Sequence, residues 1–222
     1  MTDLHYAVIA IILQLASTFA AYQYISNRTA GDIKQNIFYV KFRPIPAAFM
    51  TAVFVISAFI TCYCLLFGDS RFIRSLMNAE VFIWLGVLGY VDLKERIIPN
   101  HMIGAGLIFW VVLVLLDIFV GKTAWKSVIA YSLIGGAVCG GILLIVALLS
   151  GSALGMGDVK LFTVLGLLYG LNDTYSILLF SIVIMAVVSI ALLIARKVTR
   201  KTAVPMAPFV AVGFLLSILA GI

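Results

Sequence analysis

Hydrophobic residues in this chain run in long blocks rather than at the intervals typical of soluble helices or strands. Blocks of about 20 apolar residues match the length of helix that crosses the hydrocarbon core of a bilayer. Gly, Pro, Asn or charged residues bound the blocks, as expected where helices end. The pattern predicts eight helices, at residues 4–25, 46–67, 78–92, 100–120, 127–150, 158–171, 175–195 and 204–222.

The composition indicates that lipid surrounds most of this surface. Of the 222 residues, 64% are hydrophobic and 11% are charged, whereas soluble domains are roughly half apolar and a quarter charged. Backbone groups within a bilayer must pair internally, which helices do. We therefore expect an all-α, polytopic membrane helix bundle of about eight transmembrane helices. No repeat or linker divides it, so residues 1–222 are expected to form one domain, with two spans in 1–77 and a six-helix core in 78–222.

The positive charge predicts an orientation in the membrane rather than a nucleic-acid partner. The net charge is +6, but Lys and Arg are spread through short loops and form no basic face. Short loops rich in Lys and Arg stay in the cytoplasm. If the first loop is cytoplasmic, eleven of the fifteen basic residues lie inside and four outside. This count predicts that both termini are outside and that the loops after the third and fifth spans are cytoplasmic.

Asp92 closes the third predicted span, before a short charged segment that ends in Pro99 and Asn100. One interpretation is an ordinary cytoplasmic turn, in which nearby Lys and Arg pair with the acids and Pro99 and Asn100 begin the next helix. The other is that Asp92 carries chemistry at the membrane edge.

Asp158 opens the sixth predicted span in the sequence Gly155, Met156, Gly157, Asp158. Glycines allow a tight turn and a close approach of another segment. Asp is also a common N-cap residue, so a purely structural role is a second interpretation. Lys160 follows, where it would either lower the carboxylate pKa or extend toward the membrane surface.

The charge count places Asp92 and Asp158 on the same side of the membrane, at the ends of the two shortest predicted spans. At about 14 residues, each covers only about 21 Å of a core about 30 Å thick. Acidic side chains in a membrane usually mark a functional site. Two close carboxylates cannot both ionise easily, so one keeps a proton. An ionised aspartate activates water, and a protonated one stabilises the scissile carbonyl. The sequence does not assign the two roles.

Three segments together resemble the type IV prepilin peptidases, a family of membrane aspartyl peptidases with a Gly-x-Gly-Asp motif. "DLKERIIPN" is similar to the family's first aspartate and its Ile-Pro-Asn, "GMGDVKLF" to its second motif, and "VPMAPFVAVG" to its last helix. The resemblance implies that Asp92 and Asp158 are catalytic, that Gly155, Gly157, Lys160, Pro99 and Asn100 support them, and that neither metal nor cofactor is needed.

The resemblance also implies a substrate and a cellular location. The substrate would be a prepilin or pseudopilin, whose short basic leader is cut next to a glycine at the cytoplasmic face of the bacterial inner membrane, and whose hydrophobic helix enters among the spans. Longer members also methylate the new amino terminus and carry a cysteine-rich insertion. Residues 26–45 contain no cysteine, which makes methylation doubtful. Which prepilin is cut and the oligomeric state stay open.

Two other functions fit intramembrane aspartates. One is a small transporter in which the acids relay protons or bind a cation, and the other is an assembly component without activity. Four glycines in the fifth span, Gly135, Gly136, Gly140 and Gly141, are expected to allow close helix packing.

Overall fold

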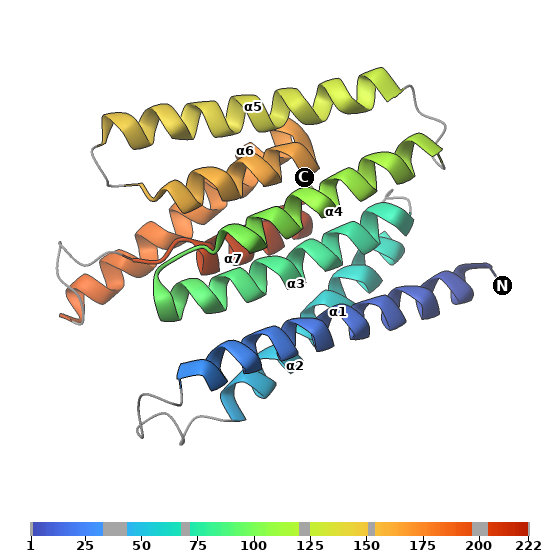
Figure 1. Ribbon diagram of the computed structural model, residues 1–222, viewed down its shortest axis with the longest axis horizontal. Coiled ribbons are helices and arrows are strands. Elements are labelled where there is room, and N and C mark those ends of the chain that lie inside the picture. The colour runs from blue at the N-terminus through green and yellow to red at the C-terminus, as the bar shows by residue number, and fades with distance from the viewer. Residues whose placement is uncertain are drawn as a thin grey trace. The chain divides into compact units, whose positions relative to one another are not determined.

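All the regular secondary structure in the part of the chain that the structure describes is helical. This computed structural model (Figure 1) describes residues 2–32, 44–67, 72–119, 125–150, 154–196 and 204–221. These residues form α-helices and no β-strand, which confirms the predicted all-α fold. The helices are α1 (Thr2–Asp32), α2 (Pro44–Phe67), α3 (Phe72–Glu95), α4 (Asn100–Phe119), α5 (Trp125–Leu149), α6 (Met156–Ile194) and α7 (Ala207–Leu219).

The chain divides into two compact units, Met1–Val87 and Leu88–Ile222. In the first, α1 and α2 are joined by a buried hydrogen bond that Gln14 Nε2 donates to Thr61 Oγ1 over 2.5 Å. Side-chain hydrogen bonds of this kind help helices associate where lipid removes the hydrophobic driving force. The division predicted between residues 77 and 78 stays a prediction.

The third helix is longer than the sequence pattern predicts. α3 begins at Phe72 and continues to Glu95, whereas the pattern placed it at residues 78–92. The polar residues that suggested a boundary lie inside the protein, with Ser75 fully buried and Asn78 8% exposed. A helix satisfies its own backbone, so small buried polar side chains do not end it. The predicted short third span is therefore wrong.

The sixth and seventh predicted spans together form α6, which is interrupted at Gly170. This residue has φ 73° and ψ −169°, outside helical geometry, and glycine adopts a positive φ without steric cost. Both ends of α6 lie toward the left of Figure 1, so the chain turns back after Gly170. Next to this break, the hydroxyl of Tyr131 donates to the carbonyl of Tyr169 over 3.3 Å. The boundary predicted between residues 171 and 175 lies close to this turn.

Glycines hold α5 directly against the first segment of α6. A Cβ added at Gly135 would collide with the backbone of Gly166, one at Gly136 would lie 2.7 Å from the side chain of Leu167, and one at Gly140 would collide with Thr163. Close packing at these three positions confirms the prediction for the fifth span. Gly141 is different, because nothing lies within 4 Å of its added Cβ.

The last helix is shorter than predicted. The pattern gave a span over residues 204–222, but α7 covers only the 13 residues Ala207–Leu219. Residues 204–206 precede the helix, and Met206 is its N-cap residue. Pro208 explains this late start, because in a helix that began at Val204 the N–H of residue 208 would have to donate to the carbonyl of Val204, and proline has no N–H.

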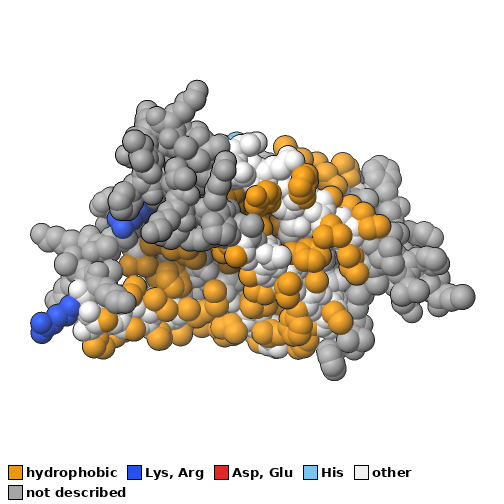
Figure 2. Space-filling view, turned by 90° about the horizontal axis from the view of Figure 1, so that it is seen from below, with side chains coloured by type: hydrophobic (Ala, Val, Ile, Leu, Met, Phe, Trp, Pro, Cys, Tyr) orange, Lys and Arg blue, Asp and Glu red, His pale blue; other side chains and the backbone are white. Residues whose placement is uncertain are grey.

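Much of the described surface is apolar, as a lipid environment requires. Hydrophobic side chains cover most of the described part of the face in Figure 2. Leu148 and Leu149 on α5 are 72% and 83% exposed, and Ile194 at the end of α6 is 77% exposed. Within the described residues, three helical stretches are long and apolar enough to cross a membrane, judged by length and composition: Arg74–Glu95, Lys126–Leu149 and Met156–Ile194.

Candidate active site

Asp92 lies in the last turn of α3 and binds the start of α7. Its Oδ2 accepts a hydrogen bond from the backbone N–H of Ala207 over 3.0 Å, and its carboxylate also accepts from the N–H of Met206. The first amides of a helix have no partner within the helix, and Met206 makes no side-chain cap hydrogen bond. Asp92, which is 6% exposed, therefore supplies the cap that α7 lacks. The first interpretation made Asp92 an acid of an ordinary turn, whereas it lies within α3.

Gly89 on α3 allows α7 to begin close to α3. A Cβ added at Gly89 would lie 3.0 Å from the Cα of Pro208, so the two backbones are in contact without an intervening side chain. Gly89 and Asp92 are three residues apart and share one face of α3. The contact at Gly89 thus holds the α7 amides against the carboxylate.

Asp158 is the third residue of α6, and its carboxylate turns back over the start of its own helix. Gly155 is the N-cap residue, and its backbone N–H donates to the Asp158 carboxylate. This is the returning half of a capping box. A Cβ on Gly155 would lie 3.1 Å from Oδ2 of Asp158, so glycine leaves room for the carboxylate. The suggestion that Asp158 itself is the N-cap residue is wrong by three positions.

Gly157 brings the segment after α3 against the start of α6. A Cβ at this position would lie 2.9 Å from the Cβ of Ile98, closer than ordinary carbon contacts of about 3.5–4.0 Å. Arg96 ends α3 with a positive φ of 55°, and its N–H donates to the carbonyl of Asp92 over 2.9 Å. The tight turn at the end of α3 and the missing side chain of Gly157 together bring the segment that follows Asp92 into contact with the segment that contains Asp158.

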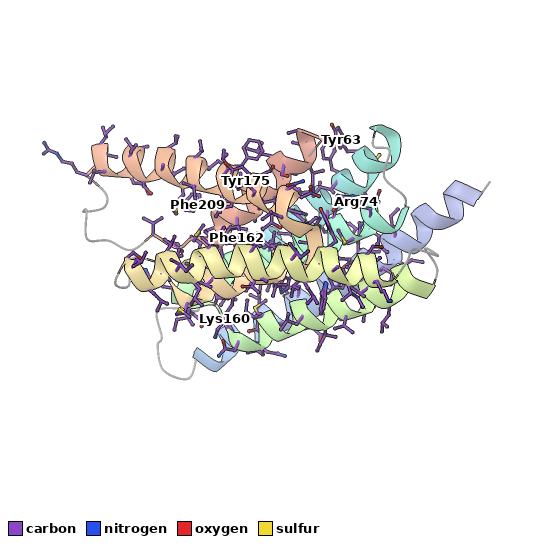
Figure 3. The ribbon with its side chains drawn as sticks, turned by 90° about the horizontal axis from the view of Figure 1, so that it is seen from above. Tyr63, Arg74, Lys160, Phe162, Tyr175 and Phe209 are labelled. Atoms are coloured by element: carbon purple, nitrogen blue, oxygen red, sulfur yellow. The ribbon has the colours of Figure 1, made fainter. Side chains whose placement is uncertain are left out.

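Lys160, which is labelled in Figure 3, lies on α6 and reaches Asn100 at the start of α4. Its Nζ donates to Oδ1 of Asn100 over 2.8 Å. Asn100 is the first residue of α4, and the carbonyl of the buried Pro99 accepts from the N–H groups of Met102 and Ile103. Lys160 is therefore a bridge between α6 and α4, which differs from both roles suggested by the sequence.

The structure brings Asp92 and Asp158 together. The charge of Asp92 acts directly on Asp158, and the two carboxylates repel each other. Lys94, the nearest basic residue in sequence, places its Nζ 4.7 Å from the ring centroid of Tyr90, a cation–π geometry. Two like charges on adjoining helices favour a state in which one carboxyl keeps its proton.

The sequence alone missed the contact between Asp92 and α7. A helix that begins at Ala207 with Met206 before it has no Ser, Thr, Asp or Asn to cap it, and that absence was the available signal. As for a metal, the described residues contain no group of three or more His, Cys, Asp or Glu side chains that could hold one. The expected independence of cofactors stays a prediction.

Comparison with known proteins defines the family. The model of the type IV leader peptidase family matches residues 79–190, which include both aspartates. The chain therefore belongs to the type IV leader peptidase family, as the three segments predicted. Family membership and the apolar helices together make it a multi-pass membrane protein.

A curated relative matches 147 residues of the chain. The prepilin leader peptidase/N-methyltransferase of Bacillus subtilis (strain 168) is 28% identical over 147 residues, which cover 66% of this chain and 56% of that protein. The match thus spans little more than half of the relative. No solved structure matches the chain.

Proposed function

We propose that this protein is an aspartyl endopeptidase that removes the leader from a prepilin or pseudopilin. The observation that carries the proposal is the electrostatic contact of Asp92 with Asp158 within the segment that matches the leader peptidase family. Burying two like charges together is unfavourable, and a shared proton relieves the repulsion. A transporter would also use intramembrane acids, but the family match favours the peptidase.

The chemistry needs only the two carboxyls and water. The ionised aspartate takes a proton from water while the water oxygen bonds to the scissile carbonyl carbon. The protonated aspartate gives its proton to the carbonyl oxygen and stabilises the charge that develops there. When the C–N bond breaks, the first aspartate passes its proton to the leaving nitrogen. The second recovers a proton from a hydroxyl of the intermediate, so the pair returns to its starting state.

The proposed location follows from the distribution of basic residues. Eleven of fifteen Lys and Arg residues lie in the loops and helix ends assigned to the cytoplasm. On this count, both aspartates are at the cytoplasmic face of the inner membrane and both termini are outside. The substrate helix enters laterally from lipid, and its leader reaches the aspartates from the cytoplasm. A basic leader is attracted to the carboxylates.

We further propose cleavage without methylation, since residues 26–45 lack the cysteines of the longer members. The methyltransferase named for the Bacillus subtilis relative belongs to a protein of which the match covers 56%. Mass spectrometry of the mature amino terminus distinguishes the two outcomes, because methylation replaces one hydrogen by a methyl group and so adds the mass of one CH₂ unit.

The test is co-expression with candidate prepilins and analysis of leader removal. Asp92→Asn and Asp158→Asn should each abolish cleavage, because Asn neither accepts a proton from water nor donates an acidic one. Lys94→Gln is the matched control, since it removes a charge beside Asp92 without removing a carboxyl. Cleavage at the wild-type rate by either Asn variant would refute the pair. Flux of protons or cations through vesicles without leader cleavage would support a transporter instead.

A further inference from the structure

Asp92 and Asp158 are held by different sets of backbone donors. Asp92 is 6% exposed and accepts from two consecutive amides, those of Met206 and Ala207. Asp158 is less buried and accepts from one amide, that of Gly155. Hydrogen bonds from backbone N–H groups favour the ionised carboxylate over the acid.

We infer that the start of α7 decides which aspartate is the base. The amides of Met206 and Ala207 hold Asp92 as the carboxylate that takes the proton from water, and Asp158 carries the proton that goes to the carbonyl oxygen. This assignment rests on the proposed peptidase function and adds to it the roles that the sequence leaves open.

The surrounding charges agree with this assignment. Both carboxylates lie near the positive end of a helix, α7 for Asp92 and α6 for Asp158, so helix dipoles do not separate them. Asp92 also lies near the carbonyl end of α3, but direct charge-assisted hydrogen bonds are stronger than this field. α7 carries no charged side chain, Lys94 lies over Tyr90, and Lys160 binds Asn100. The charge interaction that the described residues show at this site is that of Asp92 on Asp158.

Gly89 is the positioning residue for this arrangement. Its missing side chain lets Pro208 approach to a distance at which a Cβ would be 3.0 Å from Cα and 3.2 Å from N of the proline. Both atoms belong to the backbone, which cannot rotate away as a side chain would. A methyl group at residue 89 must therefore push the start of α7 away from Asp92 and lengthen its hydrogen bonds.

The first test follows the amide of Ala207 and does not depend on activity. The full-length protein, labelled with ¹⁵N-alanine in nanodiscs, is titrated with acid, and Ala207 is assigned by loss of its signal in Ala207→Gly. We expect the Ala207 amide resonance to move upfield as Asp92 gains a proton. The movement should disappear in Asp92→Asn, and in Asp158→Asn it should persist at nearly the same pH, because Asp158 is already neutral when Asp92 gains its proton. A clear move to lower pH in Asp158→Asn would mean that Asp158 is still charged at that point and would reverse the roles. An Ala207 resonance that is insensitive to pH, or unchanged in Asp92→Asn, would overturn the inference.

The second test compares Gly89→Ala with Gly104→Ala in the pH dependence of leader cleavage. Gly104 is a matched control, because nothing lies within 4 Å of a Cβ added there. With its hydrogen bonds weakened, Asp92 should take up a proton more easily. The acidic limb of kcat should then move to higher pH, the alkaline limb should stay, and kcat at the optimum should fall about tenfold. KM should change little, because neither residue binds substrate.

The outcomes separate the two proposals. A shift of the alkaline limb alone would reverse the roles, and profiles that are identical for Gly89→Ala and Gly104→Ala would show that α7 does not influence the base. If the wild-type protein cleaves no candidate prepilin, the proposed function fails, while the Ala207 titration still decides whether α7 holds Asp92 as an anion. If Gly89→Ala does not fold, the titration of Asp92→Asn supplies the test.

Discussion

Replacing Gly157 by alanine should damage the active site far more than the stability of the protein. The added Cβ would lie 2.9 Å from the Cβ of Ile98 and 3.3 Å from its Cγ1. Carbon atoms normally meet at about 3.5–4.0 Å, so the segment after α3 must move by about 0.6–1.1 Å. That segment follows directly from Asp92. Displacements of about 1 Å reduce catalysis about 100-fold, and we expect a loss of leader cleavage of about 10- to 100-fold.

The loss of stability should be small because two effects oppose each other. Crowding at Ile98 costs about 1–3 kcal/mol, and replacing a helical glycine by alanine returns up to about 1 kcal/mol. The unfolding free energy should therefore fall by less than about 3 kcal/mol. Leader cleavage and unfolding of the purified protein in detergent measure the two quantities.

Shortening the side chain of Ile98, which the new methyl group meets, should restore leader cleavage to Gly157→Ala. Ile98→Gly takes away the Cβ that the new methyl group meets, so the double variant should recover most of the lost cleavage. Ile98→Ala keeps that Cβ and should restore less. Gly104→Ala, in open space, should behave like the wild-type protein. Full activity of Gly157→Ala would refute the reasoning, as would a double variant no better than the single one.

Two further predictions concern packing away from the aspartates and are measured by unfolding in detergent. Gly140→Ala should destabilise the protein by about 1–3 kcal/mol because its Cβ meets Thr163, whereas Gly141→Ala, which faces open space, should be neutral or slightly stabilising; equal effects would contradict the α5–α6 contact. Gly170→Ala should cost at least about 1–3 kcal/mol, because φ is 73° and the ring of Tyr131 occupies the space. Tyr131→Phe should lower the unfolding free energy by at most about 1 kcal/mol, because it removes one hydrogen bond. If Tyr131→Phe destabilised the protein more than Gly170→Ala does, this prediction would be wrong.

The sequence predicted those parts of the fold that depend on local chemistry. Asn100 begins α4 as expected, because Pro99 precedes it and its own backbone N–H is not needed. The turn near Gly170 was visible as a polar interruption between two apolar runs. In both cases one residue type determines the backbone within a few positions.

Predictions failed where burial rather than composition decides. Ser75 and Asn78 are polar and suggested a boundary, yet both are buried within α3. Hydropathy scores a side chain by its type and cannot detect that the folded protein buries it. The hydrogen bond between Asp92 and Ala207 joins residues 115 positions apart, and no periodicity in the sequence reports such a contact.

The structural and the catalytic interpretations of Asp158 are compatible, and only one of them explains its surroundings. A carboxylate that merely capped α6 would need Gly155 and nothing more, since that amide satisfies the capping role. It would gain stability from distance to other acids, because like charges near a membrane repel strongly. Instead Gly157 brings the segment of Asp92 into contact with α6, and Gly89 lets α7 hold Asp92 in place. Two close approaches that each require a glycine maintain a repulsive pair, which stability alone would not favour and which peptide hydrolysis needs.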